Sequence, residues 1–290
     1  MSIEDKIRAL PIWQGNVSMA RLGGGITNVN YMVRDARRTT VVRIGDDIPL
    51  HQISRANELN ASRAAHAAGV SPEVIYHQPG FLVIEYIEGR TLTAEDIRED
   101  AVLPRALDLL KRAHRQVPFH LRGPAQVFWV FHVLRDYAAT LREGVSPHLP
   151  LLPALMAEAE TLEAAVGRIE MVFGHNDLLP ANFLDDGHRL WLIDWDYAGF
   201  GSPLFDLGGL AANNGLSEAQ EAFILSRYFD QAPDAALWRR YRAMKAAAAL
   251  RETLWSMVSE LHSKLDFDYA AYTAANLSTY RASHDAFLNS

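Results

Sequence analysis

The chain of 290 residues contains no cysteine, and it has fewer basic than acidic residues. Without cysteine, the protein can form no disulfide, no thiolate zinc site and no cysteine nucleophile. The 28 Lys and Arg residues are outnumbered by 35 Asp and Glu residues, which gives a net charge of −7. This balance argues against a general nucleic-acid binder, which would need a basic face. A small anionic ligand stays compatible with it, because a bound divalent cation can supply the local positive charge.

The sequence also lacks a long apolar run. The longest charge-free stretches, such as GPAQVFWVFHVL at 123–134, are shorter than the ~20 residues needed to cross a bilayer. The N-terminal segment MSIEDKIRALPIW is acidic early and has no apolar core typical of a signal peptide. We therefore expect a soluble cytoplasmic protein with no membrane insertion. The length suggests one large domain or two lobes.

The first third of the chain predicts a sheet of about five strands and one helix. The expected strands are Val17–Leu22, Val29–Val33, Thr39–Ile44, Val74–Tyr76 and Phe81–Tyr86. The first two flank Gly23-Gly24-Gly25 and predict a hairpin with a glycine-rich tip. Residues Ser54–Ala68 predict the helix, which should end at Gly69.

The rest of the chain is predicted to be mainly helical. The expected helices are 101–117, 126–143, 153–167, 203–213, 217–230, 234–262 and 268–288. Short strands are expected at Met171–Phe173, Asn182–Leu184 and Leu190–Ile193. This order predicts an α+β protein with two lobes and a cleft between them. The small lobe, 1–87, would hold an antiparallel sheet and one helix, and the large lobe, 88–290, would be mainly helical.

The densest group of polar side chains lies at 174–206. His175 and Asp177 are separated by one residue. Asn182 lies five residues after Asp177, and Asp194 lies twelve residues after Asn182. A β-hairpin between Asn182 and Asp194 would bring their oxygens together, and hard oxygen ligands are what Mg²⁺ requires. Asp177 would lie on a loop nearby. The alternative is a polar turn between strands, with its acids in solvent.

The order H-x-D-x-x-x-x-N followed by I-D resembles the catalytic and metal-binding segments of the protein-kinase-like superfamily. HNDLLPAN and IDWDYAGFGSPLFDL are similar to choline/ethanolamine kinases and the aminoglycoside phosphotransferase group. The resemblance extends to LGGGITNVNYMV, VVRI and LDFDY, and so covers nearly the whole chain. It implies a bilobal kinase-like fold. It also implies transfer of the γ-phosphoryl group of ATP to an amino-alcohol, with choline as the expected acceptor.

Other acceptors stay open at this stage, namely ethanolamine, thiamine and an aminoglycoside. A non-catalytic ligand sensor with a kinase fold is a further alternative. A nucleotide and a small cationic alcohol are the expected partners, and the sequence leaves the oligomeric state open.

The resemblance also implies roles for single residues. Asp177 is similar to the catalytic aspartate, and Asn182 and Asp194 are similar to the Mg²⁺ ligands. His175 would brace the catalytic loop, and Asp206 would anchor the backbone of that loop. An alcohol is a weaker acid than Asp by on the order of ten pKa units, so proton removal before attack would cost roughly 13 kcal/mol. Asp177 should therefore orient the hydroxyl and take up its proton late.

The small lobe would hold the nucleotide. The backbone N–H groups of a glycine-rich tip can approach phosphate oxygens closely, although such a tip can also be a plain flexible turn. Arg43 stands where protein kinases carry a lysine, and choline-kinase-like sequences commonly carry arginine there. Glu58 would pair with Arg43, unless the two form only an exposed surface pair. The residues expected on the nucleotide side are Gly23, Gly24, Gly25, Thr27, Asn28, Arg43, Glu58, Glu85 and Ile87.

A quaternary ammonium carries no N–H, so an aromatic cage with nearby carboxylates suits it better than hydrogen-bond acceptors. The residues expected around the acceptor are Asp196, Tyr197, Glu252, Trp255, Phe267, Tyr269 and Tyr272. The alternative is that these aromatic residues belong to the core. Eukaryotic choline kinases carry a second tryptophan where this chain has Glu252, which keeps ethanolamine open as an acceptor.

Overall fold

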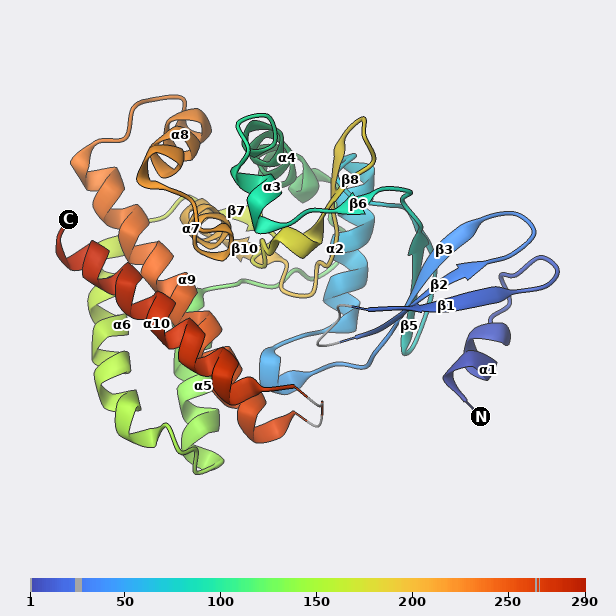
Figure 1. Ribbon diagram of the computed structural model, residues 1–290, viewed down its shortest axis with the longest axis horizontal. Helices are drawn as coiled ribbons and strands as arrows, with labels where there is room; N and C mark the ends of the chain where they lie inside the picture. Colours follow the sequence, from blue (N-terminus) through green and yellow to red (C-terminus); the bar gives the residue numbers. More distant parts are fainter. Residues whose placement is uncertain (1, 24–27, 264, 266) are drawn as a thin grey trace.

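The computed structural model describes residues 2–23, 28–263, 265 and 267–290. A five-stranded antiparallel sheet lies at one end, and a larger helical part lies at the other (Figure 1). The strand order is β1-β2-β3-β5-β4. The strands are β1 (Ser18–Leu22), β2 (Val29–Arg34), β3 (Thr39–Ile44), β4 (Val74–Gln78) and β5 (Phe81–Glu85). All five predicted strands are confirmed.

The two faces of the sheet have different partners. Val42 on β3 pairs with Val83 on β5, and both are fully buried in a small cluster that includes Ile7. Ile7 comes from α1 (Ile3–Arg8), a helix that the sequence analysis did not predict. Because side chains alternate along a strand, the next residue, Arg43, points to the opposite face. One face of the sheet therefore packs on α1, and the other faces the helical part.

The helix α2 (Arg55–Ala67) joins the sheet to the rest of the molecule. It follows a single 3₁₀ turn, η1 (Pro49–His51), and covers most of the predicted range. Its buried alanines, Ala61, Ala64 and Ala65, belong to the large core of the helical part rather than to the small cluster under the sheet. The position of α2 relative to the helical part is therefore set by close packing.

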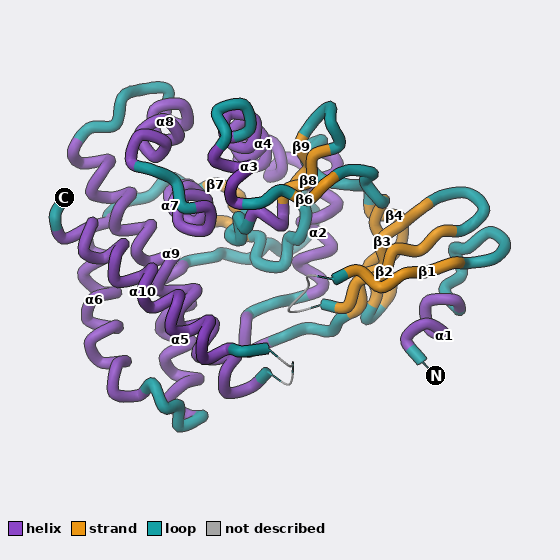
Figure 2. The backbone as a smooth tube through the Cα atoms, viewed as in Figure 1, coloured by secondary structure: helices purple, strands orange, loops and turns teal. Residues whose placement is uncertain are grey.

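The helical part is built around α9 (Ala235–His262), a helix of 28 residues. It packs against α10, α7, α5 and α6 (Figures 1 and 2). The other helices are α3 (Ala94–Arg98), α4 (Leu103–Gln116), η2 (Val117–His120), α5 (Val130–Glu143), η3 (Leu149–Leu151), α6 (Leu152–Val166), α7 (Pro203–Asn214), α8 (Glu218–Phe229) and α10 (Tyr269–Leu288). The predicted α+β organisation is confirmed. Within the residues described here, no helix combines the length and the apolar character needed to cross a bilayer.

The helix predicted at 126–143 begins later than expected, at Val130. The preceding residues are extended instead, because Phe128 N donates to Phe200 O and Phe200 N donates to Gln126 O, each at 2.8 Å. Phe200 lies in β10 (Gly199–Gly201). A Cβ on Gly201 would lie 2.5 Å from the Phe128 carbonyl oxygen, so this close approach requires glycine. Pairing with a distant strand has overridden the local helical preference.

One antiparallel strand pair, one hairpin and a 3₁₀ turn carry the polar segment between α6 and α7. The strand β7 (Val172–Gly174) pairs with β10, and β8 (Phe183–Asp185) pairs with β9 (Leu190–Leu192). The turn η4 (Pro180–Asn182) leads into β8, and β6 (Arg90–Thr91) adds a third strand beside β8. The three strands predicted in this segment are therefore present.

Candidate active site

The β8–β9 hairpin brings Asn182 and Asp194 to the same end, as the sequence predicts. Ile193 N donates to Asn182 O at 3.0 Å across the base of the hairpin. The side chain of Asn182 reaches back to Asp177, because its Nδ2 donates to Asp177 O at 2.8 Å and to Asp177 Oδ2 at 3.2 Å. Asp177, Asn182 and Asp194 line one hollow. The alternative of a solvated polar turn is therefore wrong.

The loop that carries Asp177 is anchored by hydrogen bonds to Asp206, which lies in the first turn of α7. Its Oδ2 accepts from His175 N at 2.8 Å, and its Oδ1 accepts from Asn176 N at 2.7 Å. His114 Nε2 lies 2.8 Å from Oδ2 as well. Burial opposes ionisation of Asp206, but the contact with His114 and the backbone donors outweigh it and lower the pKa of this carboxyl. The expected anchoring role of Asp206 is confirmed.

His175 and two unusual backbone conformations complete the loop. His175 Nε2 lies 2.9 Å from Ile193 O, so the histidine braces the loop against the hairpin as expected. Asn176 and Asp194 have φ of 65° and 69°, in the left-handed region. Such conformations cost on the order of 1–3 kcal/mol and persist where the surroundings over-determine them. Asn176 is held by a hydrogen bond from its Nδ2 to Tyr197 O at 2.9 Å.

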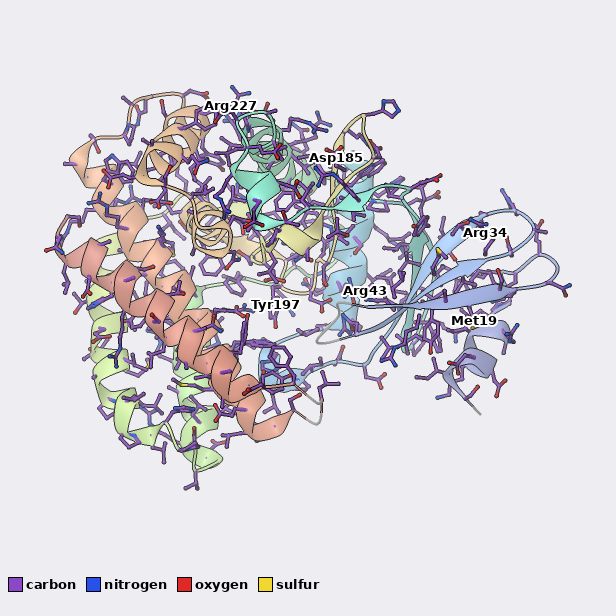
Figure 3. All side chains as sticks on the ribbon, viewed as in Figure 1. Met19, Arg34, Arg43, Asp185, Tyr197 and Arg227 are labelled. Carbon is purple, nitrogen blue, oxygen red and sulfur yellow. The ribbon has the colours of Figure 1, made fainter. Side chains whose placement is uncertain are left out.

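A buried network of ion pairs connects the sheet to this hairpin. Arg43 Nη1 lies 3.2 Å from Glu58 Oε1, and Arg43 Nη2 lies 2.9 Å from Asp194 Oδ1. Figure 3 shows Arg43 where the sheet meets the helical part. The expected pair of Arg43 with Glu58 is present, and both side chains are buried. The alternative of an exposed surface pair is wrong.

The sequence analysis missed a second arginine in this network. Arg55 Nη1 lies 2.7 Å from Glu58 Oε2 and 2.8 Å from Asp196 Oδ1. Its spacing of three residues from Glu58 at the start of a helix was the available signal. Asp196, expected beside the acceptor, thus bridges Arg43 and Arg55, and Asn28 Nδ2 donates to its other oxygen at 3.2 Å.

Burial and the neighbouring arginines act in opposite directions on the pKa values of the carboxyl groups of the site. Burial raises the pKa of Asp177 to about 8, against the attraction of Arg251. It also raises the pKa of Asp194, and that of Glu58 to about 7, in both cases against the attraction of Arg43. For Asp196 the balance is reversed, because Arg43 and Arg55 outweigh burial and lower its pKa.

The charges and donors of the site suit a divalent cation. The carboxyl groups of Glu58, Asp177, Asp194, Asp196 and Glu252 outnumber the guanidinium groups of Arg43, Arg55 and Arg251. Among the described residues, no group of three or more His, Asp or Glu side chains could hold a metal by itself. Asn182 and Asp194 can offer one amide oxygen and one carboxylate. Mg²⁺ commonly accepts so few protein ligands, because it takes its others from phosphate and water.

The same hollow also contains residues expected around the acceptor, and we refer to it as the acceptor hollow. Its volume is about 110 Å³. The predicted residues that line it are Asp177, Asn182, Asp194, Asp196, Tyr197, Glu252, Trp255 and Tyr272. Trp255 Nε1 donates to the Tyr197 hydroxyl at 2.9 Å, and the Tyr272 hydroxyl donates to Glu252 Oε1 at 2.8 Å. These rings therefore form a wall of the hollow and are held in place by hydrogen bonds.

Two predicted acceptor residues lie outside this wall. Tyr269 lines a neighbouring hollow, which Trp255 also lines. Phe267 is 44% exposed and lines neither hollow, although its ring packs on Tyr269 and Tyr272 at centroid distances of 4.9 Å and 5.7 Å. The spacing of these aromatic residues along the helix could not distinguish the two hollows.

Arg251 lines the acceptor hollow and was also missed. Its guanidinium carbon lies 4.1 Å from the centroid of the Tyr197 ring, and its Nη1 lies 2.9 Å from Glu252 Oε2. It is buried on α9. The nearby Asp177, Tyr197 and Glu252 hold the pKa of Arg251 above its usual value despite burial. A charged pair within the otherwise apolar middle of a long helix was the signal for it.

The nucleotide side is described only in part. Gly24, Gly25 and Thr27 lie outside the described residues, and Gly23 directly follows β1. The backbone N–H of Glu85 is already bonded to Glu73 O at 2.8 Å. The side chain of Glu85 lines a separate surface hollow. Ile87 lies between β5 and β6, outside both strands. An adenine contact at this hinge stays a prediction.

Comparisons with known proteins agree with this geometry. Residues 18–249 match the model of the phosphotransferase enzyme family. Protein LicA of Haemophilus influenzae is 28% identical over 261 residues, which cover 85% of this chain and 75% of that protein. Ethanolamine kinase 2 of Mus musculus is 26% identical over 306 residues, covering 93% and 77% of the two chains.

A solved structure shows the same likeness in three dimensions. It is a choline/ethanolamine kinase family protein from Mesorhizobium loti, with a TM-score of 0.76 and 28% identity. The match covers 97% of this chain and 95% of that chain. The kinase-like fold inferred from the motifs is therefore confirmed, and the chain belongs to the phosphotransferase enzyme family.

Proposed function

We propose that this protein transfers the γ-phosphoryl group of ATP to the hydroxyl of a small cationic amino-alcohol, with choline as the first choice and ethanolamine as the second. One observation carries the proposal. A single hollow has Asp177, Asn182 and Asp194 on one side and Trp255, Tyr272 and Glu252 on the other. A cationic alcohol bound against the rings would therefore have its hydroxyl beside Asp177. The names of the similar proteins, which include ethanolamine kinases, support the same class of acceptor.

In the proposed reaction, the acceptor oxygen forms a bond to the γ-phosphorus while the bond from that phosphorus to the β–γ bridging oxygen breaks. ADP leaves, and the hydroxyl proton passes to Asp177 and then to solvent. The transition state of such a transfer is loose, so positioning and charge stabilisation provide most of the rate. Asn182 Nδ2, at 3.2 Å from Asp177 Oδ2, holds the carboxyl in place.

Asn182 and Asp194 are the residues that we expect to hold Mg²⁺, which when bound neutralises charge on the phosphate oxygens. Arg43 lies beside Asp194, and Glu58 and Asp194 fix its guanidinium from two directions. The planar fork of arginine suits phosphate oxygens. We therefore assign Arg43 to the nucleotide phosphates.

Glu252 supplies negative charge for a cationic nitrogen beside the rings of the acceptor hollow. Its Oε1 accepts from the Tyr272 hydroxyl, and its Oε2 is paired with Arg251 Nη1. Each oxygen keeps a further lone pair, so a primary ammonium can add a hydrogen bond there, and ethanolamine stays the second choice. A quaternary ammonium needs only ring faces and nearby negative charge.

The test is an acceptor panel of choline, ethanolamine, thiamine and an aminoglycoside, with ADP release and phosphorylated product both measured. We expect the highest kcat/KM for choline. Turnover of the aminoglycoside without turnover of choline would reject the proposed acceptor. Binding of Mg·ATP without phosphoryl transfer to any member of a broad panel would instead favour the non-catalytic ligand sensor.

A further inference from the structure

A second and larger hollow is also lined by Trp255, and we refer to it as the outer chamber. Its volume is about 310 Å³. It shares Trp255 and Asn28 with the acceptor hollow, so the two are neighbours along one wall. Its lining is mixed, with apolar or aromatic residues and with polar or charged ones: Ile48, Leu50, Leu265 and Tyr269, and Arg21, His51, Ser259 and His262.

The wall between the two spaces is built by a contact between distant parts of the chain. His51, at the end of η1, stacks on Trp255 with ring centroids 4.9 Å apart and an interplanar angle of 30°. His51 Nε2 lies 3.2 Å from Ser259 Oγ on α9. Trp255 is also bonded to Tyr197 on its other side. The indole ring is therefore held firmly and presents surface to both hollows.

The two spaces differ in charge. Four carboxyl groups line the acceptor hollow, those of Asp177, Asp194, Asp196 and Glu252. Among the described residues, none that lines the outer chamber is acidic. Burial lowers the pKa of His51 to about 3, so its ring is neutral near pH 7. A cationic group is thus favoured in the first space, whereas the second, which Arg21 also lines, disfavours a cation and leaves its rings to a neutral aromatic or apolar group.

The size of the outer chamber is sufficient for such a group. A protein cavity of about 150 Å³ can bind benzene, and the outer chamber is larger than that. Choline has only methyl groups on its nitrogen and would leave this space to water. An acceptor with a ring on its nitrogen would bury that ring against Trp255, His51 and Tyr269.

We propose that the acceptor site has two chambers, and that the protein accepts alcohols whose cationic nitrogen carries a neutral aromatic or apolar substituent. The hydroxyl and the cation occupy the acceptor hollow, and the substituent occupies the outer chamber. This inference rests on the proposed function and extends it to a larger class of acceptor.

The test compares choline with benzyl(2-hydroxyethyl)dimethylammonium, in which a benzyl group replaces one methyl group. We expect KM for the benzyl compound to be about tenfold lower, because the phenyl ring leaves water. Leu50→Trp should fill the outer chamber and raise KM for the benzyl compound about tenfold, with KM for choline unchanged. Leu288→Trp, at the far end of α10, is the matched control and should change neither value.

The outcomes separate this inference from the proposed function. If choline is phosphorylated but the benzyl compound has an equal or higher KM, the two-chamber site is rejected and the proposed function stands. The same holds if Leu50→Trp changes KM for both acceptors equally. If neither is phosphorylated, the proposed function is rejected. Calorimetric titration of the wild-type protein and of Leu50→Trp with the benzyl compound then tests the outer chamber independently of turnover. Leu50→Trp should weaken binding only if the benzyl group occupies that chamber.

Discussion

The position of Asp177 is set by hydrogen bonds from and to neighbouring residues, which hold both its backbone and its carboxyl group. Asp206 holds the backbone on its N-terminal side through His175 and Asn176, and Asn182 holds its carboxyl. A substitution that preserves shape but removes the negative charge should therefore leave the loop intact. This makes the role of the charge separable from the role of the fold.

We expect Asp177→Asn to lower kcat at least about 100-fold, because the amide cannot take up the hydroxyl proton. ATP binding should be nearly unchanged, since we place Asp177 on the acceptor side. Steady-state kinetics and calorimetric titration with ATP measure the two quantities. Asp230→Asn is the matched control. Asp230 lies far along the chain on an exposed cap with φ of 55°, which asparagine also adopts. A kcat for Asp177→Asn close to that of this control would reject the assignment.

At the scale of elements, the crossing of α7 and α9 positions both halves of the site. α7 carries Asp206, and α9 carries Arg251, Glu252 and Trp255. The helices meet at Gly208, where a Cβ would lie 2.8 Å from the Lys245 Cα atom. A side chain at this point would push two backbones apart. The adjacent Gly209 has open space around the same position.

We therefore expect opposite effects from two neighbouring substitutions in α7. Gly208→Ala should lower the free energy of unfolding by about 1–3 kcal/mol, because it overpacks the crossing. Gly209→Ala should raise it by up to about 1 kcal/mol, because alanine favours the helix and meets no atom. Urea denaturation of the two variants measures both values. If both variants change the free energy of unfolding equally, the close approach of α7 and α9 at Gly208 does not exclude a side chain.

At the scale of the whole molecule, the connection between sheet and helical part passes through η1 and α2. His51 is 9% exposed and is fixed between Trp255 and Ser259. Its pKa is lowered to about 3 by burial and by the nearby Arg251. The neutral form is therefore required for this docking, and protonation favours the unfolded chain, in which the pKa is near ~6.5.

The sign of the pH dependence follows from these values. The contribution of neutral His51 is complete above about pH 6.5 and is lost as the pH falls toward about 3, by up to ~1.4 kcal/mol per pH unit. His51→Gln cannot titrate but keeps a polar partner for Ser259. We expect the stability of the wild-type protein to fall more steeply between about pH 7 and about pH 5 than that of this variant. Parallel urea-denaturation curves across this range would contradict it.

Features that depend on local patterns could be predicted from the amino-acid sequence. Strands were predictable from β-branched runs, and the helical ranges were predictable from composition and end signals. The order of His175, Asp177, Asn182 and Asp194 indicated the chemistry, because a short loop and a hairpin bring such residues together. The helix α1 could also have been found, since Ser2 and Asp5 form a capping box.

Only the tertiary structure decided the features that join distant segments. Arg43 and Asp194 are 151 residues apart in the chain, and Arg55 and Asp196 are 141 residues apart, so no spacing rule connects either pair. The late start of α5 has the same origin, in strand pairing with Phe200. Periodicity describes which side chains share a face of one element, whereas a site wall depends on how several elements pack. For this reason the sequence could single out the aromatic residues that line these hollows, and only packing divides them between the two.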